Sequence, residues 1–379
     1  MTATSTTPLD LLDALLRIDS VNPGLDPGGA GEAQIAAFVA GWGRAAGLRT
    51  QVLEGRPGRP SVILRGGQNT GGRRLLLCGH LDTVGLSGTR DALTLRVDGD
   101  RLYARGAYDM KAGLAAALIA CRDAALADID GEVIVAAVAD EERASLGIQD
   151  VLTHLDPASI DAAVVTEPTE RQAGTAHRGF VWTEVTITGV AAHGSRPHLG
   201  ADAILAAGHH LVAFDHLDQQ LRGRPHPFLG PGNLHASLIT GGTDECTIPD
   251  RCVFTVERRT LPGETLERVE ADIADLLERC RPADPRLNVC ARTLLYRPPM
   301  ETPASAPVVQ ALLAAAGPGT TVAPMSYWAD SAFLSAAGIP TVLYGPEGEG
   351  AHADIEWVSR SGTTTTTTVL TQLAQDFCS

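Results

Sequence analysis

The first part of the chain alternates between amphipathic stretches and short apolar runs. Apolar residues recur at helical spacing over 9–18 and 31–46, and an alanine-rich stretch predicts a third helix over 110–126. Strands are expected at 49–54 and 61–65, and continuous apolar runs typical of strands with both faces covered lie at 75–79, 132–139 and 162–166. This alternation favours an α/β fold with a mostly parallel sheet flanked by helices.

The pattern changes at about residue 180. Residues 181–188 alternate between apolar and polar positions, which is typical of a strand with one exposed face. A helix at 201–214, strands at 234–240 and 252–259, a helix at 266–280 and a strand at 287–295 are expected to follow. This β-α-β-β-α-β order is that of the ferredoxin-like fold.

The first pattern resumes after Arg297, with helices expected over 306–316 and 331–336 and a strand over 341–345. The six-threonine run at 363–368 predicts a helix of poor intrinsic propensity near the C-terminus. The sequence therefore predicts an α/β domain of residues 1–179 and 295–379, interrupted by an inserted domain of residues 180–294.

Composition excludes several classes of protein. The chain has 379 residues, of which 44% are hydrophobic and 20% are charged, as in a folded protein of about two domains. A formal net charge of −15 argues against a nucleic-acid partner and against docking on anionic lipid. No apolar run reaches the roughly 18 residues of a membrane span. Seven cysteines without a C-x-x-C pair, and no stretch typical of a signal peptide, favour a reduced, cytoplasmic protein.

Polar side chains follow the buried strands of the α/β part. Because the carboxyl ends of parallel strands meet at one edge of a sheet, we expect these side chains to converge on one cleft. Asp109 lies between a short strand and the alanine-rich helix. The others are His80 and Asp82 after strand 75–79, residues 140–142 (Asp-Glu-Glu) after strand 132–139, Glu167 after strand 162–166, and His352 and Asp354 after the last strand.

These residue types indicate a metal centre. Two histidines and at least four carboxylates without a thiolate suit zinc, cobalt or manganese. Their number exceeds one closed site and fits two ions that share a carboxylate. Glu141 and Glu142 are adjacent, so one can bind a metal while the other remains free as a base. Taken singly, a His-x-Asp pair or a run of acids is more often a solvated surface feature, but the strand before 140–142 is buried.

Six motifs together resemble the zinc aminoacylase and carboxypeptidase family. That family includes acetylornithine deacetylase, succinyl-diaminopimelate desuccinylase, aminoacylase and glutamate carboxypeptidase. The motifs occur in the family's order and extend over nearly the whole chain. They lie at 79–84 (GHLDTV), 106–113 (GAYDMKAG), 140–142 (DEE) with Gly147, 166–168 (TEP), 193–197 (HGSRP) with Gly200, and 351–352 (AH).

The resemblance implies two zinc ions, with cobalt or manganese as alternatives, and a role for each of eight residues. His80, Asp109 and Glu167 would hold one ion, and Asp109, Glu142 and His352 would hold the other, so that Asp109 bridges them. Glu141 would be the general base, and Asp82 would hydrogen-bond to His80 and fix its tautomer. His193 would reach the active site of the partner subunit in a homodimer and polarise the scissile carbonyl. The peptide bond between Asp109 and Met110 would be cis.

Two arginines are candidates for binding a substrate carboxylate, which a guanidinium can hold in a bidentate fork. Arg259 matches the arginine that the family uses for this purpose, and Arg178 is a weaker candidate. Arg258 is expected to face solvent, because neighbours on a strand alternate between faces. Desuccinylases have asparagines just before the Ile-Pro turn, where this chain has residues 245–247 (Glu-Cys-Thr), and this departure disfavours a succinylated substrate.

We therefore expect a di-zinc amidohydrolase that cleaves the amide bond of a small N-acyl amino acid, as acetylornithine deacetylase does. One alternative is a dipeptidase or carboxypeptidase with the same site. An alternative of another class is a binding or scaffold protein that has lost catalysis, although no ligand or base is missing. A serine hydrolase is disfavoured, because the chain has no Gly-x-Ser-x-Gly motif.

Overall fold

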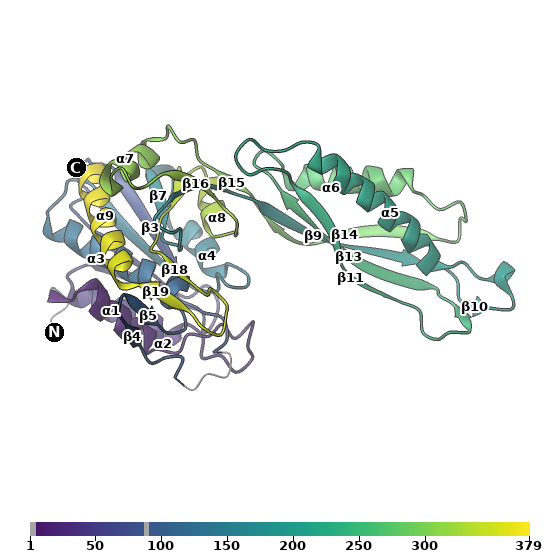
Figure 1. The fold of residues 1–379 in the computed structure, drawn as a ribbon, viewed down its shortest axis with the longest axis horizontal. Coiled ribbons are helices and arrows are strands. Elements are labelled where there is room, and N and C mark those ends of the chain that lie inside the picture. The colour runs from purple at the N-terminus through teal and green to yellow at the C-terminus, as the bar shows by residue number, and fades with distance from the viewer. Residues whose placement is uncertain (1–4, 87–90) are drawn as a thin grey trace. The chain divides into compact units, whose positions relative to one another are not determined.

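A computed structural model describes residues 5–86 and 91–379, and the chain divides into two compact units (Figure 1). The first unit comprises Met1–Thr175, Thr302–Met325 and Ala329–Ser379. The second comprises Ala176–Glu301 and Ser326–Trp328, a range that contains the whole of the expected insert at 180–294. Within the described residues, no helix has both the length and the apolar character needed to cross a lipid bilayer.

The first unit contains most of a nine-stranded sheet with a parallel centre, which confirms the predicted fold class. Its strand order is β1-β2-β6-β3-β7-β17-β8-β15, and a further strand, β16 (Val322–Met325), pairs with β8. The central strands β6, β3, β7 and β17 are parallel, and the flanking strands β1, β2, β8 and β15 are antiparallel to their neighbours. The bounds are β1 (Arg49–Leu53), β2 (Ser61–Gly66), β3 (Arg74–His80), β6 (Glu132–Val138), β7 (Ala162–Val165), β8 (Ala173–His177), β15 (Met300–Glu301) and β17 (Thr341–Leu343).

Helices bury the apolar side chains of this sheet. The inward faces of four helices pack with Leu75 and Leu77 of β3 in one hydrophobic core. They are α1 (Pro8–Leu16), α3 (Ala112–Leu126), α7 (Pro307–Ala316) and α9 (Arg360–Cys378), and α2 (Ala33–Ala45) contributes to the same core. Outside this core, α4 (Leu146–His154) and α8 (Ser331–Ala336) contact each other and the sheet. Because β3 and β6 are buried along almost their whole length, they read in sequence as uninterrupted apolar runs.

Local signals explain where two of these helices begin. Thr7 and Asp10 form a reciprocal capping box at the start of α1, with Pro8 at the first helical position. Ser359 caps α9, and the hydroxyls of Thr363 and Thr367 donate to main-chain carbonyls four residues earlier. The predicted C-terminal helix is thus confirmed, and four of its threonines donate their hydroxyls within the helix, whereas the buried hydroxyl of Thr366 has no hydrogen-bond partner among the described residues.

A small second sheet joins two distant parts of the first unit. Its strand order is β18-β19-β5-β4, and all of its pairs are antiparallel. The strands are β4 (Arg96–Asp98), β5 (Arg101–Tyr103), β18 (Gly348–Glu349) and β19 (Trp357–Ser359). β5 leads into an irregular helical turn, Ala107–Lys111, and β19 follows the loop that carries His352. The pairing of β5 with β19 therefore brings the Asp109 loop and the His352 loop together.

The second unit has the predicted β-α-β-β-α-β order. Its antiparallel sheet runs β11-β13-β9-β14, and the two helices share a core with it. In chain order the elements are β9 (Gly179–Thr188), α5 (Ala203–Arg222), β11 (Asn233–Gly241), β13 (Arg251–Thr260), α6 (Leu266–Arg279) and β14 (Asn288–Arg297). Helix α5 begins two residues later and ends eight residues later than the predicted 201–214, because Leu217 and Leu221 continue its packed face. A separate two-stranded sheet joins β10 (Ala192–His193) to β12 (Thr247–Ile248).

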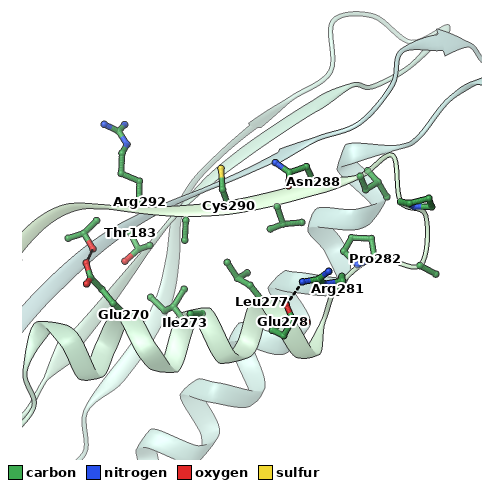
Figure 2. A pocket seen from close by; sticks show the side chains of 17 residues that line it. Thr183, Glu270, Ile273, Leu277, Glu278, Arg281, Pro282, Asn288, Cys290 and Arg292 are labelled. Atoms are coloured by element: carbon green, nitrogen blue, oxygen red, sulfur yellow. Dashed lines mark hydrogen bonds and ion pairs between the residues drawn. The ribbon is translucent and has the colours of Figure 1, made fainter.

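Figure 2 shows a pocket of about 890 Å³ between α6 and β14 of the second unit. Several of its charged lining residues are already paired locally. Glu278 forms an ion pair with Arg281, and Glu270 accepts a hydrogen bond from the hydroxyl of Thr293. None of the residues that line this pocket belongs to the candidate site described below.

Candidate metal centre

The candidate residues of the first unit lie at the carboxyl edge of its parallel strands. His80 is the last residue of β3, and it pairs in register with Val138 at the end of β6. Glu141 and Glu142 follow β6 within four residues, and Glu167 follows β7. Because parallel strands in register end side by side, residues far apart in the sequence meet at one edge.

His80, Asp109 and Glu167 form the first donor group. The Nε2 atom of His80 lies 3.1 Å from Oδ1 of Asp109 and 3.8 Å from Oε1 of Glu167. The donor atoms of all three residues lie within 4.8 Å of one another. His80 is buried, and its Nδ1–H donates to the main-chain carbonyl of Asp82 at 2.9 Å. The lone pair of Nε2 is therefore directed toward the carboxylates.

Asp109, Glu142 and His352 form the second donor group. The Nε2 atom of His352 lies 3.2 Å from Oδ2 of Asp109 and 2.9 Å from Oε2 of Glu142. Asp109 thus belongs to both groups, with Oδ1 toward His80 and Oδ2 toward His352. A carboxylate in this position has the geometry of a bridging ligand.

The chemistry of the donors fits divalent cations. Each group offers one imidazole nitrogen and two carboxylates, a set typical of zinc and related ions. The pKa of Glu167 is raised to about 8, chiefly by burial. The carboxylates of Asp109 and Glu142 contribute to this rise, while His80 opposes it. Burial and Asp109 likewise raise the pKa of Glu142. The cluster therefore concentrates negative charge that bound cations would neutralise, and each group can hold one ion.

Glu141 lies beside this cluster and is a member of neither donor group. Its pKa is raised well above the ordinary value, first by burial and then by the carboxylate of Asp330. Its main-chain N–H donates to Oδ1 of Asp82 at 3.1 Å. Of the two adjacent glutamates, only Glu142 belongs to a donor group.

The contact expected between Asp82 and His80 has a different geometry. The Asp82 carboxylate is 3.8 Å from Nδ1 of His80, and the hydrogen bond is made by the Asp82 carbonyl. The two carboxylate oxygens accept instead from the main-chain N–H groups of Glu141 and Glu142, at 3.1 and 3.2 Å. The expectation of a side-chain hydrogen bond is corrected, because the carboxylate is occupied by the turn that follows β6.

Glu356 supports the Asp109 loop, and sequence reasoning missed it. Its carboxylate is buried and accepts from the main-chain N–H groups of Gly106, Tyr108 and Asp109, at 2.8–3.0 Å. It also accepts from the guanidinium of Arg105 at 2.8 Å. The signal in the sequence was a glutamate four residues after His352 and just before an apolar strand, where a solvated acid is out of place.

The backbone around the site is unusual at several points. The Asp109–Met110 peptide bond is cis, as the resemblance implies. Asp140 and His352 have left-handed backbone conformations, with φ of 65° and 63°. Gly113, at the start of α3, packs against the loop of Glu167, and a Cβ there would lie 1.8 Å from the carbonyl oxygen of Thr166. Only glycine allows this close approach.

The remaining candidates lie in the second unit. His193 is an exposed residue of β10, and its Nδ1 accepts from the main-chain N–H of Ser195 at 3.2 Å. The guanidinium of Arg259 stacks over Phe180, 5.3 Å from the ring centroid, and is partly exposed. Arg178 donates through Nη2 to the carbonyl of Leu229.

The prediction that Arg258 faces solvent is wrong. Its side chain is only 2% exposed, and it forms ion pairs with Asp272 and Glu264. The even-numbered residues of β13, among them Phe254 and Val256, point into the core beneath the helices. Arg258 shares their face, and the two carboxylates at its end compensate for the burial of its charge.

The sequence matches known proteins over most of its length. Residues 76–376 match Peptidase family M20/M25/M40. The chain is 31% identical over 365 residues to the acetylornithine deacetylase of Edwardsiella ictaluri, with 91% of both chains covered. It is 30% identical over 325 residues to the acetylornithine deacetylase of Myxococcus xanthus, with 84% of this chain and 83% of the other covered.

Solved structures share the fold at low sequence identity. The aminopeptidase PepT of Bacillus cereus matches with a TM-score of 0.77 and 17% identity, over 98% of both chains. The YXEP protein of Bacillus subtilis, described as a dinuclear metal binding peptidase, matches with a TM-score of 0.75 and 16% identity. That match covers 100% of this chain and 99% of the other. The chain therefore belongs to Peptidase family M20/M25/M40 and is a metal-dependent hydrolase.

Proposed function

We propose that this protein is a two-metal amidohydrolase that removes the acyl group from an N-acyl amino acid. The observation that carries the proposal is the position of Asp109 between two donor groups, with the Glu141 carboxylate beside them and in neither. The two acetylornithine deacetylases, each related to this chain over more than four fifths of its length, support an N-acyl amino acid as the substrate class.

In this proposal His80, Asp109 and Glu167 hold one zinc ion, and Asp109, Glu142 and His352 hold the other. Cobalt or manganese are alternatives with the same donor preference. When bound, the two ions would polarise the amide carbonyl and lower the pKa of the attacking water. The hydrogen bond from Nδ1–H of His80 to the Asp82 carbonyl fixes the tautomer in which Nε2 is free to bind a metal.

Glu141 is the general base in this mechanism. Its carboxylate takes a proton from the water that attacks the amide carbonyl, and it then donates that proton to the nitrogen of the leaving amine. Burial raises the pKa of Glu141, so its carboxylate holds the transferred proton more firmly than an ordinary carboxylate would until that proton passes to the leaving amine. The negative charge of Asp330 is the second largest cause of that rise, after burial.

In a homodimer, His193 of one subunit donates a hydrogen bond to the carbonyl oxygen of the substrate bound in the active site of the other subunit. Because Nδ1 accepts the N–H of Ser195, the neutral ring carries its proton on Nε2, which makes Nε2 a donor. Such a donor stabilises the oxyanion of the tetrahedral intermediate. The exposed position of His193 on β10 is consistent with action outside its own unit.

The partner in this proposal is a second copy of the chain at the β11 edge. β11 is an edge strand, and its consecutive residues Leu238 and Ile239 are 70% and 58% exposed although they point to opposite faces. Leu205 and Val212 of the adjoining helix α5 are exposed as well. Pairing of two identical edges would cover these side chains in a symmetric interface.

Arg259 is the proposed ligand of the substrate carboxylate. Its guanidinium is partly exposed and lies over the ring of Phe180. Its Nη1 forms an ion pair with Oε1 of Glu257 at 3.6 Å, which a substrate carboxylate would have to share or replace. Arg178 is the second candidate, but one of its terminal nitrogens already donates to the carbonyl of Leu229.

A cytoplasmic location is proposed on the ground that all seven cysteines, each in a described part of the chain, are free thiols.

A substrate panel tests this function. Steady-state rates should be measured on acetylornithine, other N-acetyl amino acids, succinyl-diaminopimelate and dipeptides, with zinc, cobalt and manganese forms of the protein. We expect kcat/KM for at least one N-acetyl amino acid to exceed that for every dipeptide by tenfold or more. The reverse order would assign the chain to the dipeptidases or carboxypeptidases. No hydrolysis by any metal form would favour a binding or scaffold protein.

A further inference from the structure

Asn22 lies in a buried position behind the candidate metal centre, although it is not part of any motif named above. It follows α1, is fully buried, and its main-chain N–H donates to the carbonyl of Thr83 at 2.8 Å. Its Nδ2 donates to Oδ2 of Asp82 at 2.7 Å and to Oδ1 of Asp140 at 3.0 Å. Its Oδ1 accepts from the N–H of Gly24, so every polar atom of the side chain is used.

The two carboxylates that Asn22 joins determine the path of the turn after β6. Asp82 accepts the main-chain N–H groups of Glu141 and Glu142, one on each oxygen. Asp140 adopts a left-handed conformation, which is uncommon for a residue with a side chain, and its carbonyl accepts from Ser145 at 2.6 Å. The turn therefore depends on Asp82 from one side and on Asp140 from the other.

Three carboxylates are buried near this turn, and like charges repel one another strongly unless hydrogen-bond donors lie between them. Asp82, Asp140 and Glu32 are all buried, and a single guanidinium, that of Arg59, reaches two of them. Arg59 forms a bidentate pair with Glu32 and donates to Asp140 at 2.7 Å. The side-chain contact between Asp82 and Asp140 runs through the two amide hydrogens of Asn22.

We propose that Asn22 is a positioning residue that holds Glu141 and Glu142 in register with the metal centre. It acts through Asp82 and Asp140, and its side chain hydrogen-bonds to neither glutamate. The inference rests on the proposed roles of Glu141 as base and Glu142 as metal ligand. Removing the amide would let the two carboxylates separate, and the turn that carries both glutamates would shift with them.

Two variants and one control test this role. Asn22→Ala removes both hydrogen bonds, and Asn22→Asp replaces the amide with a third carboxylate of nearly the same shape. Leu370→Ala is the control, because Leu370 is buried in the α9 core and its loss lowers stability without touching the turn. Each protein is loaded with Co²⁺, and its visible absorption spectrum, melting temperature, kcat and KM are compared with those of the native protein.

We expect kcat of Asn22→Ala to fall by about 10- to 100-fold, the usual effect of losing a group that orients metal ligands. KM should stay within about twofold, because Asn22 does not touch the substrate in this proposal. Asn22→Asp should be more impaired than Asn22→Ala, since it adds repulsion. Both variants should alter the Co²⁺ spectrum, because the position of the Glu142 ligand changes, and the control should alter neither kcat nor the spectrum.

A lowered melting temperature with native kcat and a native Co²⁺ spectrum would overturn the proposal and leave Asn22 a merely structural residue. The spectrum also separates this inference from the proposed function. If the native protein hydrolyses none of the substrates, the proposed function fails, while the Co²⁺ spectrum of Asn22→Ala still decides whether Asn22 positions the metal ligand. An unchanged spectrum in that case overturns the positioning role as well.

Discussion

Replacement of Glu141 by glutamine separates the base from the ligands. Glutamine is nearly isosteric and keeps the main-chain hydrogen bond to Asp82, so the turn should be preserved. The side chain of Glu141 lies among the carboxylates of Asp330, Glu167 and Glu142, and removal of its charge relieves repulsion. We therefore expect the Glu141→Gln protein to fold and to bind metal as the native protein does.

The expected loss in turnover follows from the role of the group. General acid–base catalysis contributes about 10²- to 10⁴-fold, which corresponds to about 3–5 kcal/mol of transition-state stabilisation. The assay is kcat on the best N-acyl substrate, together with metal content by mass spectrometry after dialysis. Glu142→Gln is the matched control, since Glu142 belongs to a donor group and its loss should lower metal content as well.

The two variants together also show whether the roles of base and metal ligand are assigned to the right glutamates. If Glu141→Gln loses metal together with activity, while Glu142→Gln keeps its metal and loses only turnover, the assignment of base and ligand is reversed. A loss smaller than about tenfold in kcat for Glu141→Gln, with metal retained, would remove Glu141 from proton transfer altogether.

Three further outcomes are expected. Protein saturated with zinc and then gel-filtered should contain about two equivalents per chain, and one equivalent with full activity would contradict a bridging Asp109. Mixing inactive His193→Ala and Glu141→Gln proteins under confirmed subunit exchange should restore activity, because one site of a mixed dimer is intact if His193 acts in trans; a mixture that stays inactive contradicts this. Burial lowers the pKa of His177 to about 4, so the folded state resists its protonation. His177 should therefore cost no stability above about pH 6.5, and below that pH it should lower the free energy of unfolding by about 3 kcal/mol toward pH 4. His177→Gln should remove this part of the pH dependence of thermal unfolding.

Much of the architecture was accessible from the sequence because its parallel strands are buried. The runs that form β3, β6 and β7 are apolar without interruption, so the polar residues that follow them mark the edge where they end. The inserted β-α-β-β-α-β unit was accessible for a different reason, namely the alternating pattern of β9 and β13. In both cases the pattern reflects which faces of a strand are covered.

Other features depend on contacts that no local pattern reports. Helix α4 was not predicted, because Ile148 and Val151 are the only large apolar residues that it buries. Arg258 was misplaced because its charge concealed a core position, which two carboxylates on other segments make tolerable. Asn22 and Glu356 resemble loop residues in the sequence, and their importance appears only when partners 60 to 250 residues away are placed beside them.

The pairing of β5 with β19 has a consequence for how the protein is made. The loop of Asp109 is supported by Glu356, which follows its partners by about 250 residues. During synthesis, the N-terminal part of the chain therefore emerges with the bridging aspartate but without the strand that holds its loop in place. Metal loading should accordingly be a late event that follows the completion of translation. A nascent chain stalled before residue 348 should bind zinc only weakly, because the loop of Asp109 is not yet held beside the other donors.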